Sequence, residues 1–329
     1  MKMTIEGIVR EAVGLRATDI HLTFGMPPSL RVGSDIVTCE SDAVDASTFE
    51  SLRARCNDEG HDAAAEIEGQ RIRVHFFQAA DRMCATLRVL YGGDIRLPDT
   101  KESAVLKRIA ETRDGLVLIA GPTGSGKSFT LAQCIDHINR NYARHIVTLE
   151  DPIEFVFSPV KSLVHQRQTG RDVVSMAEGV RDALREDPDV IMLGELRDRS
   201  TLEAALHAAE TGHLVFATIH TQRAVMSVNR MLSVFPAEQQ EEVRCQLSQV
   251  LRAVICQRLA VIDGTFVPVR DILLNTPAVA NLIRQRKEPQ IISVQETSAP
   301  MQTFETAVRA LRAEWGDRPE LDGIIGDMS

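Results

Sequence analysis

The sequence contains few aromatic residues, and this scarcity excludes one class of function. Phe, Trp and Tyr make up 4% of the 329 residues, too few for the stacked aromatic platforms that bind single-stranded nucleic acids. The net charge is −9 at pH 7, whereas binding a phosphate backbone requires a basic surface. We therefore expect no nucleic acid partner. An acidic surface also gives no reason for direct adsorption to anionic lipid.

Paired cysteines and long apolar runs are lacking as well. The six cysteines are Cys39, Cys56, Cys84, Cys134, Cys245 and Cys256. Because none of them forms a C-x-x-C pair, we expect reduced, mostly buried thiols rather than a zinc site or a disulfide framework. The N-terminal stretch lacks the continuous apolar core of a signal peptide, and no stretch approaches the roughly 18 apolar residues of a membrane span. A cytoplasmic protein without direct membrane insertion is predicted.

Length and pattern predict two domains of the α/β class. Residues 1–95 have the mixed pattern of an α+β domain, with one helix at the start, another near residues 47–57, and the strand-like segments DIHLTF, PPSLRV, QRIRVHFF and MCATLRVLY. Residues 96–100 are the predicted linker, preceded by Gly92 and Gly93. From residue 101 strands alternate with helices, which implies a parallel sheet covered on both faces. The pattern is mainly helical from about residue 225 to residue 329.

The segment GPTGSGKS follows the buried apolar run GLVLIA and fits the phosphate-loop pattern G-x-x-x-x-G-K-[ST]. In such a loop the glycines let backbone N–H groups face the β-phosphate, Lys127 neutralises phosphate oxygens, and the Ser128 hydroxyl serves Mg²⁺. A fortuitous glycine turn is the alternative, but the strand–loop–helix context favours a site for ATP and Mg²⁺. The predicted nucleotide-binding residues are Gly121, Pro122, Thr123, Gly124, Ser125, Gly126, Lys127, Ser128 and Phe129.

Two apolar segments end in acids where parallel strands would reach the same sheet edge as this loop. DPDVIMLGE ends in Glu195, which we expect to hold Mg²⁺ or its water shell. LEDPIEF carries three carboxylates, of which Glu154 is the predicted general base or water-orienting group. Glu150 and Asp151 fit strand-end or Mg²⁺-shell roles. An ordinary solvated turn is the commoner origin of such a cluster.

A histidine and several arginines are further candidates for contact with the γ-phosphate. LVFATIHT ends its predicted strand in His220, although a lone histidine there is more often structural. In the first domain Arg71, Arg73, Arg82 and Arg88 alternate with apolar residues, as on the polar face of a sheet. Such a face is usually only solvated. In a ring ATPase it can supply arginine fingers to a neighbouring nucleotide.

These motifs resemble those of the secretion and type IV pilus ATPases, a family of ring-forming P-loop NTPases. GPTGSGKS is similar to its Walker A motif, LEDPIEF to its Asp box, DPDVIMLGELRD to its Walker B motif and ETGHLVFATIHT to its His box. The resemblance implies a homo-hexamer in which each chain has a PAS-like N-terminal domain and a RecA-like ATPase domain. It assigns catalytic roles to Glu154, Glu195, His220, Arg73 and Arg88, with Ser128 and Glu195 on the metal.

Within that family the chain resembles the compact retraction branch. It has neither the long N-terminal extension nor the tetracysteine insertion of many other members. ATDIHLTFGMPPSLRV is similar to that branch's opening motif, and residues 275–291 resemble its C-terminal segment, with Val279, Ala280 and Gln285 replacing the usual Ile, Arg and Glu.

The resemblance implies an ATP hydrolase that powers retraction of a type IV pilus. Its expected partner is the inner-membrane platform protein, which would hold the cytoplasmic ring at the inner face of the membrane through protein contacts. The alternatives are a secretion or pilus-assembly ATPase of the same family and a low-turnover, nucleotide-switched regulatory ring.

Overall fold

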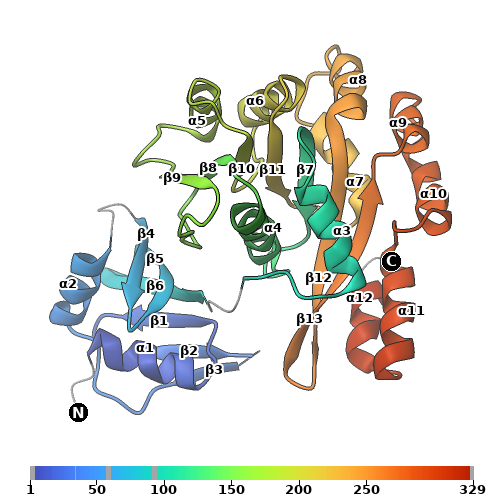
Figure 1. Ribbon diagram of the computed structural model, residues 1–329. Helices are drawn as coiled ribbons and strands as arrows, with labels where there is room; N and C mark the ends of the chain where they lie inside the picture. The colour runs from blue at the N-terminus through green and yellow to red at the C-terminus, as the bar shows by residue number, and fades with distance from the viewer. Residues whose placement is uncertain (1–3, 34, 57–60, 91–94, 327–329) are drawn as a thin grey trace. The chain divides into compact units, whose positions relative to one another are not determined.

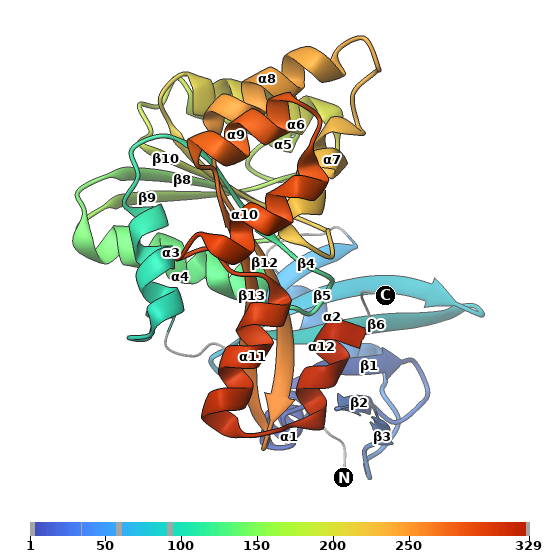
Figure 2. The ribbon, with the colours of Figure 1, turned by 90° about the vertical axis from the view of Figure 1, so that its right-hand side faces the viewer.

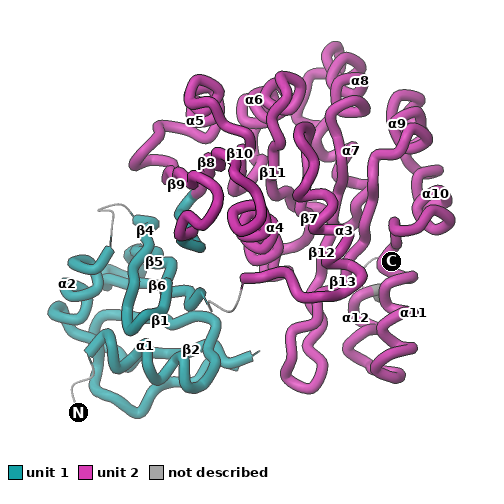
Figure 3. The backbone as a smooth tube through the Cα atoms, in the orientation of Figure 1, with its two compact units in different colours: residues 1–94, 151–156 teal, residues 95–150, 157–329 magenta. Residues whose placement is uncertain are grey.

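The chain forms two compact units, which Figure 3 shows in different colours. The computed structural model describes residues 4–33, 35–56, 61–90 and 95–326. The first unit comprises Met1–Asp94 and Asp151–Val156, and the second comprises Ile95–Glu150 and Phe157–Ser329. Nothing in the sequence pattern had indicated that residues 151–156 belong with the first unit. Gly92 and Gly93, which precede the predicted linker, lie outside the described residues.

The first unit is an antiparallel sheet with two helices. Its six strands have the order β3-β2-β1-β6-β5-β4. The elements are α1 (Ile5–Gly14), β1 (Asp19–Thr23), β2 (Ser29–Val32), β3 (Asp35–Thr38), α2 (Ala46–Arg55), β4 (Asp62–Ile67), β5 (Gln70–Ala79) and β6 (Arg82–Leu90). Helix α1 begins where the Thr4 side chain accepts a hydrogen bond from the Gly7 N–H. Its buried face, including Ile8 and Val9, packs into the core of this unit.

The second unit is built on a seven-stranded sheet of order β13-β12-β7-β11-β10-β8-β9. All neighbouring strands are parallel except the edge pair of β12 and β13. The strands are β7 (Gly115–Ala120), β8 (His145–Glu150), β9 (Leu163–Gln168), β10 (Val190–Leu193), β11 (Leu214–Ile219), β12 (Leu251–Ile262) and β13 (Thr265–Leu274). Strands β7, β10 and β11 are buried along their whole length, as expected of a sheet covered on both faces.

Helices cover this sheet on both faces (Figures 1 and 2). The helices are α3 (Lys101–Ala110), α4 (Lys127–Asn141), α5 (Met176–Ala183), α6 (Arg199–Glu210), α7 (Ala224–Leu232), α8 (Gln240–Val250), α9 (Pro277–Arg284), α10 (Ile291–Thr297), α11 (Phe304–Trp315) and α12 (Asp322–Gly326). Helix α4 packs with α3, whereas α5 packs with α6 and α6 with α8. Through α4 the chain passes from β7 to β8, three positions along the sheet, whereas through α6 it passes in the opposite direction from β10 to the neighbouring β11. Right-handed crossovers therefore place α4 and α6 on opposite faces.

The C-terminal region contains the expected helices and also a long hairpin that was not expected. Strands β12 and β13 pair from Ala253↔Leu274 to Ile262↔Thr265. Helix α9 forms the central part of the segment, residues 275–291, that resembles the retraction motif. Val279 and Ile283 of this helix are 0% exposed and belong to the main core, so the Ile-to-Val difference at position 279 preserves an apolar core position.

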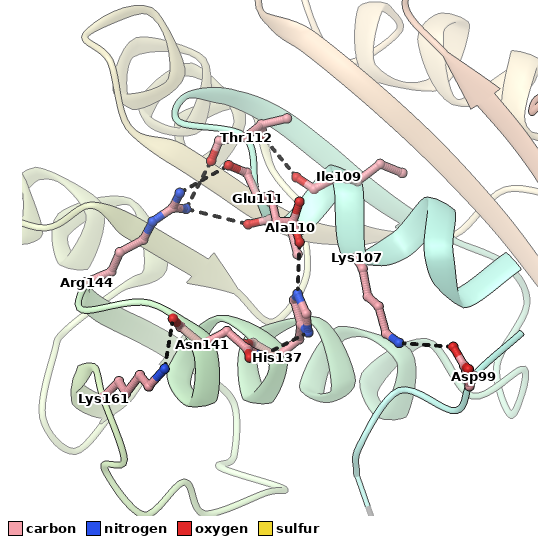
Figure 4. Close-up of polar contacts among 10 residues, drawn as sticks. All are labelled: Asp99, Lys107, Ile109, Ala110, Glu111, Thr112, His137, Asn141, Arg144 and Lys161. Carbon is pink, nitrogen blue, oxygen red and sulfur yellow. Dashed lines mark hydrogen bonds and ion pairs between the residues drawn. The ribbon is translucent and has the colours of Figure 1, made fainter. Parts of the chain in front are cut away.

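A polar cluster fixes the C-terminal end of α3 (Figure 4). The Arg144 guanidinium donates to the carbonyl oxygens of Thr112 at 3.0 Å and Glu111 at 3.1 Å. His137 of α4 lies 3.4 Å from a carboxylate oxygen of Glu111. A cation at the last carbonyls of a helix satisfies groups that have no partner within the helix. Helix α3 is therefore held by both α4 and the start of β8. In the described part of the chain, no helix is long and apolar enough to cross a bilayer.

Candidate nucleotide site

The phosphate loop and two other predicted motifs meet at one edge of the second sheet. Because β7, β11 and β10 are parallel neighbours, their carboxyl ends lie together. The loop follows β7, His220 follows β11, and Glu195 follows β10. The Gly121 N–H also donates to the Ile219 carbonyl at 3.3 Å, joining the start of the loop to the strand that carries His220. Ligands in open α/β sheets bind at this edge.

Gly121 allows an unusually close approach between the loop and β12. Its φ is +142°, and a Cβ placed there would lie 2.3 Å from the Gln257 carbonyl oxygen and 2.6 Å from the Ser125 hydroxyl oxygen. Both values are well below van der Waals contact. Glycine is required at this position for its conformation and for its size.

Lys127 and Ser125 lie inside the loop. Lys127 is 8% exposed, and its Nζ donates to the carbonyl oxygens of Gly121 at 2.9 Å and Pro122 at 2.8 Å. The Ser125 hydroxyl is buried and has no hydrogen-bond partner among the described residues. A buried hydroxyl without a partner is costly. Both groups fit a loop whose hydrogen bonding is completed by a bound phosphate chain.

Glu195 and His220 form one polar group at the ends of their strands. His220 Nε2 lies 3.3 Å from one carboxylate oxygen of Glu195, and Arg197 lies 2.9 Å from the other. The Gly194 N–H donates to the Leu149 carbonyl at 2.8 Å, which ties this turn to β8. Glu195 and His220, predicted separately at the ends of their strands, therefore form an ion-pair contact at this edge that the sequence had not indicated. Arg197, which the sequence analysis did not single out, orients the same carboxylate.

Glu150, at the end of β8, is a buried carboxylate that neighbouring side chains hold in place. It is 5% exposed, and its Oε1 accepts hydrogen bonds from the Thr148 hydroxyl at 2.6 Å and the Gln166 amide at 3.0 Å. The contact with Gln166 ties β8 to β9. Of the two roles predicted for Glu150, this geometry favours the strand-end role.

Glu154 and the arginines belong to the first unit. Glu154 is half-buried, with no ion-pair partner among the described residues. Beside it in the chain, the Ile153 carbonyl accepts a hydrogen bond from Arg71 at 3.2 Å. The buried Arg71 Nε has no partner in the described part of the chain. The Asp-box segment thus has an arginine contact that the family motif did not indicate.

Arg73 and Arg88 lie directly opposite each other on β5 and β6. Arg88 Nε donates to Asp19 at 2.9 Å, and Arg73 lies 3.9 Å from Asp62. The sheet therefore presents these two cations side by side on one face, each beside a carboxylate. Arg82 is at the far end of the same hairpin, opposite Ala79. Arg82 is six positions from Arg88 along β6, which corresponds to about 20 Å.

The C-terminal helices hold the segment that follows His220. Arg223 forms a two-pronged ion pair with Glu305 of α11, and the hydrogen bonds that it donates to the Glu305 carboxylate raise the pKa of Arg223. The Ala224 N–H donates to Asp271 of β13 at 3.0 Å. Burial raises the pKa of Asp271 to about 6. This network joins the His-box segment to the C-terminal region.

The oxygen donors at the sheet edge fit Mg²⁺ held partly by nucleotide. Among the described residues, no three His, Cys, Asp or Glu side chains gather as a metal site. Mg²⁺ in nucleotide enzymes typically uses one or two protein oxygens together with phosphates and water. The Ser128 hydroxyl and the Glu195 carboxylate are donors of this kind, so both remain proposed metal ligands.

Comparison with known proteins identifies the family. The model of the type II/IV secretion system protein family matches residues 70–304. The chain belongs to this family. It is 40% identical over 312 residues to the type IV pilus retraction ATPase PilT of Pseudomonas aeruginosa, covering 91% of each chain. It is also 39% identical to the uncharacterized protein YggR of Escherichia coli K12, covering 90% of this chain and 93% of that one.

A solved structure of the family confirms the fold class. The pilus retraction motor PilT with bound ADP matches with a TM-score of 0.83 and 39% identity, covering 97% of this chain and 96% of that one. An antiparallel N-terminal sheet, a mainly parallel second sheet and C-terminal helices are therefore the architecture of this secretion-family ATPase. The predicted resemblance, the ATPase assignment and nucleotide binding are confirmed with it.

Proposed function

We propose that this chain is a motor that hydrolyses ATP to drive retraction of a type IV pilus. The observation that carries the proposal is the similarity to the retraction ATPase PilT, which extends over 91% of both chains. The loop, Glu195 and His220 at one sheet edge support it, because they supply the parts that phosphoryl transfer requires.

The proposed chemistry assigns one task to each group. The phosphate loop binds the β- and γ-phosphates through its N–H groups and Lys127. Ser128 and Glu195 would hold Mg²⁺, which would neutralise charge on the phosphate oxygens. Glu154 orients the attacking water, and His220 contacts the γ-phosphate. Arg73 and Arg88 stabilise the charge that develops on the transferred phosphoryl group.

We further propose an assembly in which six copies form a ring. The paired cations Arg73 and Arg88 reach nucleotide either in their own chain or in a neighbour. The ring lies in the cytoplasm and engages the platform protein of the pilus machine at the inner membrane. This attachment uses protein contacts, since a net charge of −9 does not favour anionic lipid.

Two alternatives remain distinct from a retraction motor. The first is another motor of the same family, which serves pilus assembly or secretion. The second is a regulatory ring with little turnover. The presence of Glu154, Glu195 and His220 together favours turnover.

Deletion of the gene in its own host distinguishes these functions. Loss of a retraction motor leaves pili assembled but abolishes their shortening, so surface pilin rises and surface motility stops. Loss of an assembly motor removes the pili, and loss of a secretion motor changes neither. Complementation with wild type, but not with Lys127→Met, assigns the phenotype to ATP use. A deletion strain that lacks pili would overturn the retraction proposal.

A further inference from the structure

Gln257 lies against the phosphate loop but belongs to none of the motifs described above. It is in the middle of β12, and the parallel register Cys256↔Ala120 places it beside Gly121. It is 2% exposed. A polar side chain buried this deeply next to a phosphate loop requires partners, and those partners define what it does.

The Gln257 amide connects three elements of the second unit. Its Nε2 donates to the Ser125 carbonyl in the loop at 2.6 Å. Its Oε1 accepts from the Thr130 hydroxyl in the first turn of α4 at 2.8 Å and from Arg270 Nε of β13 at 2.9 Å. A Cβ built on Gly126 would lie 2.9 Å from the same Nε2. The amide therefore packs directly beneath the loop.

The orientation of this amide follows from its partners. An arginine side chain can only donate hydrogen bonds, so the atom facing Arg270 must be the amide oxygen. A backbone carbonyl can only accept, so the atom facing Ser125 must be the amide nitrogen. The two requirements agree, and a flipped amide would break both contacts.

Arg270 is itself fixed, so the orientation of the amide has a rigid support. It is 6% exposed and donates to Glu102 of α3 at 2.8 Å. Gln302, between α10 and α11, donates to the other oxygen of Glu102 at 2.8 Å and to the Arg270 carbonyl at 2.9 Å. The chain of contacts runs from the loop through β12 and β13 to α3 and the C-terminal region.

We propose that Gln257 is a positioning residue that sets the phosphate-binding conformation of the loop. In a trans peptide the carbonyl and the next N–H point in opposite directions. By holding the Ser125 carbonyl beneath the loop, Gln257 turns the Gly126 N–H to the other side, where a phosphate chain binds. Without this contact the peptide between Ser125 and Gly126 can rotate. The Ser125 carbonyl oxygen would then face the phosphates and repel them.

Two substitutions at Gln257 and one buried control test this role. Gln257→Glu keeps the acceptor for Thr130 and Arg270 but replaces the donor to Ser125 with an oxygen, whereas Gln257→Leu removes all three contacts. The control is Gln133→Leu. Gln133 is also a buried glutamine, 6% exposed on α4, but its amide donates to the Arg96 carbonyl at 3.1 Å, away from the loop. The readouts are the Kd of ADP with MgCl₂ by calorimetry, the melting temperature without nucleotide, and kcat and KM for ATP.

Both Gln257 variants are expected to raise the Kd of ADP by about tenfold or more, since one hydrogen bond is worth about this factor. The KM for ATP rises in parallel while kcat stays within about threefold, because uniform phosphate binding is lost and the reacting groups remain. Gln133→Leu lowers the melting temperature but leaves the Kd within about twofold of wild type. A Kd within about twofold of wild type for folded Gln257→Glu would overturn the proposal.

Thr130→Val provides a milder test if the Gln257 variants do not fold. It removes one of the two donors to Oε1 without changing the size of the side chain. We expect the Kd of ADP to rise by about three- to fivefold, because the oxygen of the amide is then held by Arg270 alone. An unchanged Kd in this variant would overturn the proposal independently. A failure of the proposed retraction function in the host would not overturn this proposal, because these measurements concern nucleotide binding alone.

Discussion

Substitution of Gly121 by alanine is expected to destabilise the second unit through a defined contact. The added Cβ would lie 2.3 Å from the Gln257 carbonyl oxygen, where φ is +142°. Because β12 is hydrogen-bonded to β13 on one side and to β7 on the other, that carbonyl cannot move away easily. Either the loop or β12 has to shift by about 1 Å to restore contact distance. A left-handed conformation costs a residue with a Cβ about 1–2 kcal/mol, and overpacking adds about 1–3 kcal/mol.

Gly124 supplies the matched control. It also has a positive φ, +79°, but an added Cβ meets nothing within 4 Å. Gly124→Ala should therefore cost only the conformational part, about 1–2 kcal/mol. The difference of about 2 kcal/mol corresponds to a melting temperature about 4–8 °C lower for Gly121→Ala than for Gly124→Ala. Thermal unfolding followed by circular dichroism without nucleotide measures it. Equal melting temperatures would refute the close approach of the loop to β12.

Two further predictions concern charged groups in the second unit. Lys127→Met should weaken binding of ADP by about 100-fold or more, since it removes the buried ammonium that we propose contacts the phosphates; calorimetry measures the Kd, and binding within tenfold of wild type would contradict the proposed role. Asp271→Asn should change how stability depends on pH. The folded-state pKa of about 6 lies above the ordinary value of 3.8, so the stabilisation is present below pH 4 and is lost as pH rises through 6. Urea unfolding should show wild type losing about 3 kcal/mol relative to Asp271→Asn between pH 4 and pH 8, and parallel pH profiles would contradict this.

The positions of the phosphate loop and of Glu195 were predictable because their signals are local. GLVLIA and VIML are apolar runs bounded by turn residues, and each leads directly to a chemical group. Such runs are typical of buried parallel strands. The loop, Glu195 and His220 then meet because parallel strands end at one edge.

The β12–β13 hairpin could not be predicted in the same way. Helix α8 ends at Val250 and β12 begins at Leu251, with neither glycine nor proline between them. The apolar pattern therefore continues from helix into strand without a local stop signal. Gln257 was missed for this reason, since its role depends on β12 lying beside β7.

Two other features arise from long-range packing. The contact of Arg71 with the Ile153 carbonyl joins residues 82 positions apart, and no local pattern reports such a pairing. Strand β9 has mostly polar residues and lies at the edge of its sheet, so its sequence lacks the apolar run that marks its neighbours. The family motif indicated Arg73 and Arg88 but gave no sign of Arg71.

The most direct test of the account is the ATPase rate of Glu154→Gln against wild type. The substitution removes a carboxylate but retains its shape, so nucleotide should still bind. Glu203→Gln is a suitable control, because Glu203 is an exposed residue of α6 that pairs with Arg199. The account predicts that hydrolysis falls by about 100-fold or more in Glu154→Gln, with the Kd of ADP unchanged, and that Glu203→Gln behaves as wild type. Wild-type turnover in Glu154→Gln would contradict the account, since another group would then orient the attacking water.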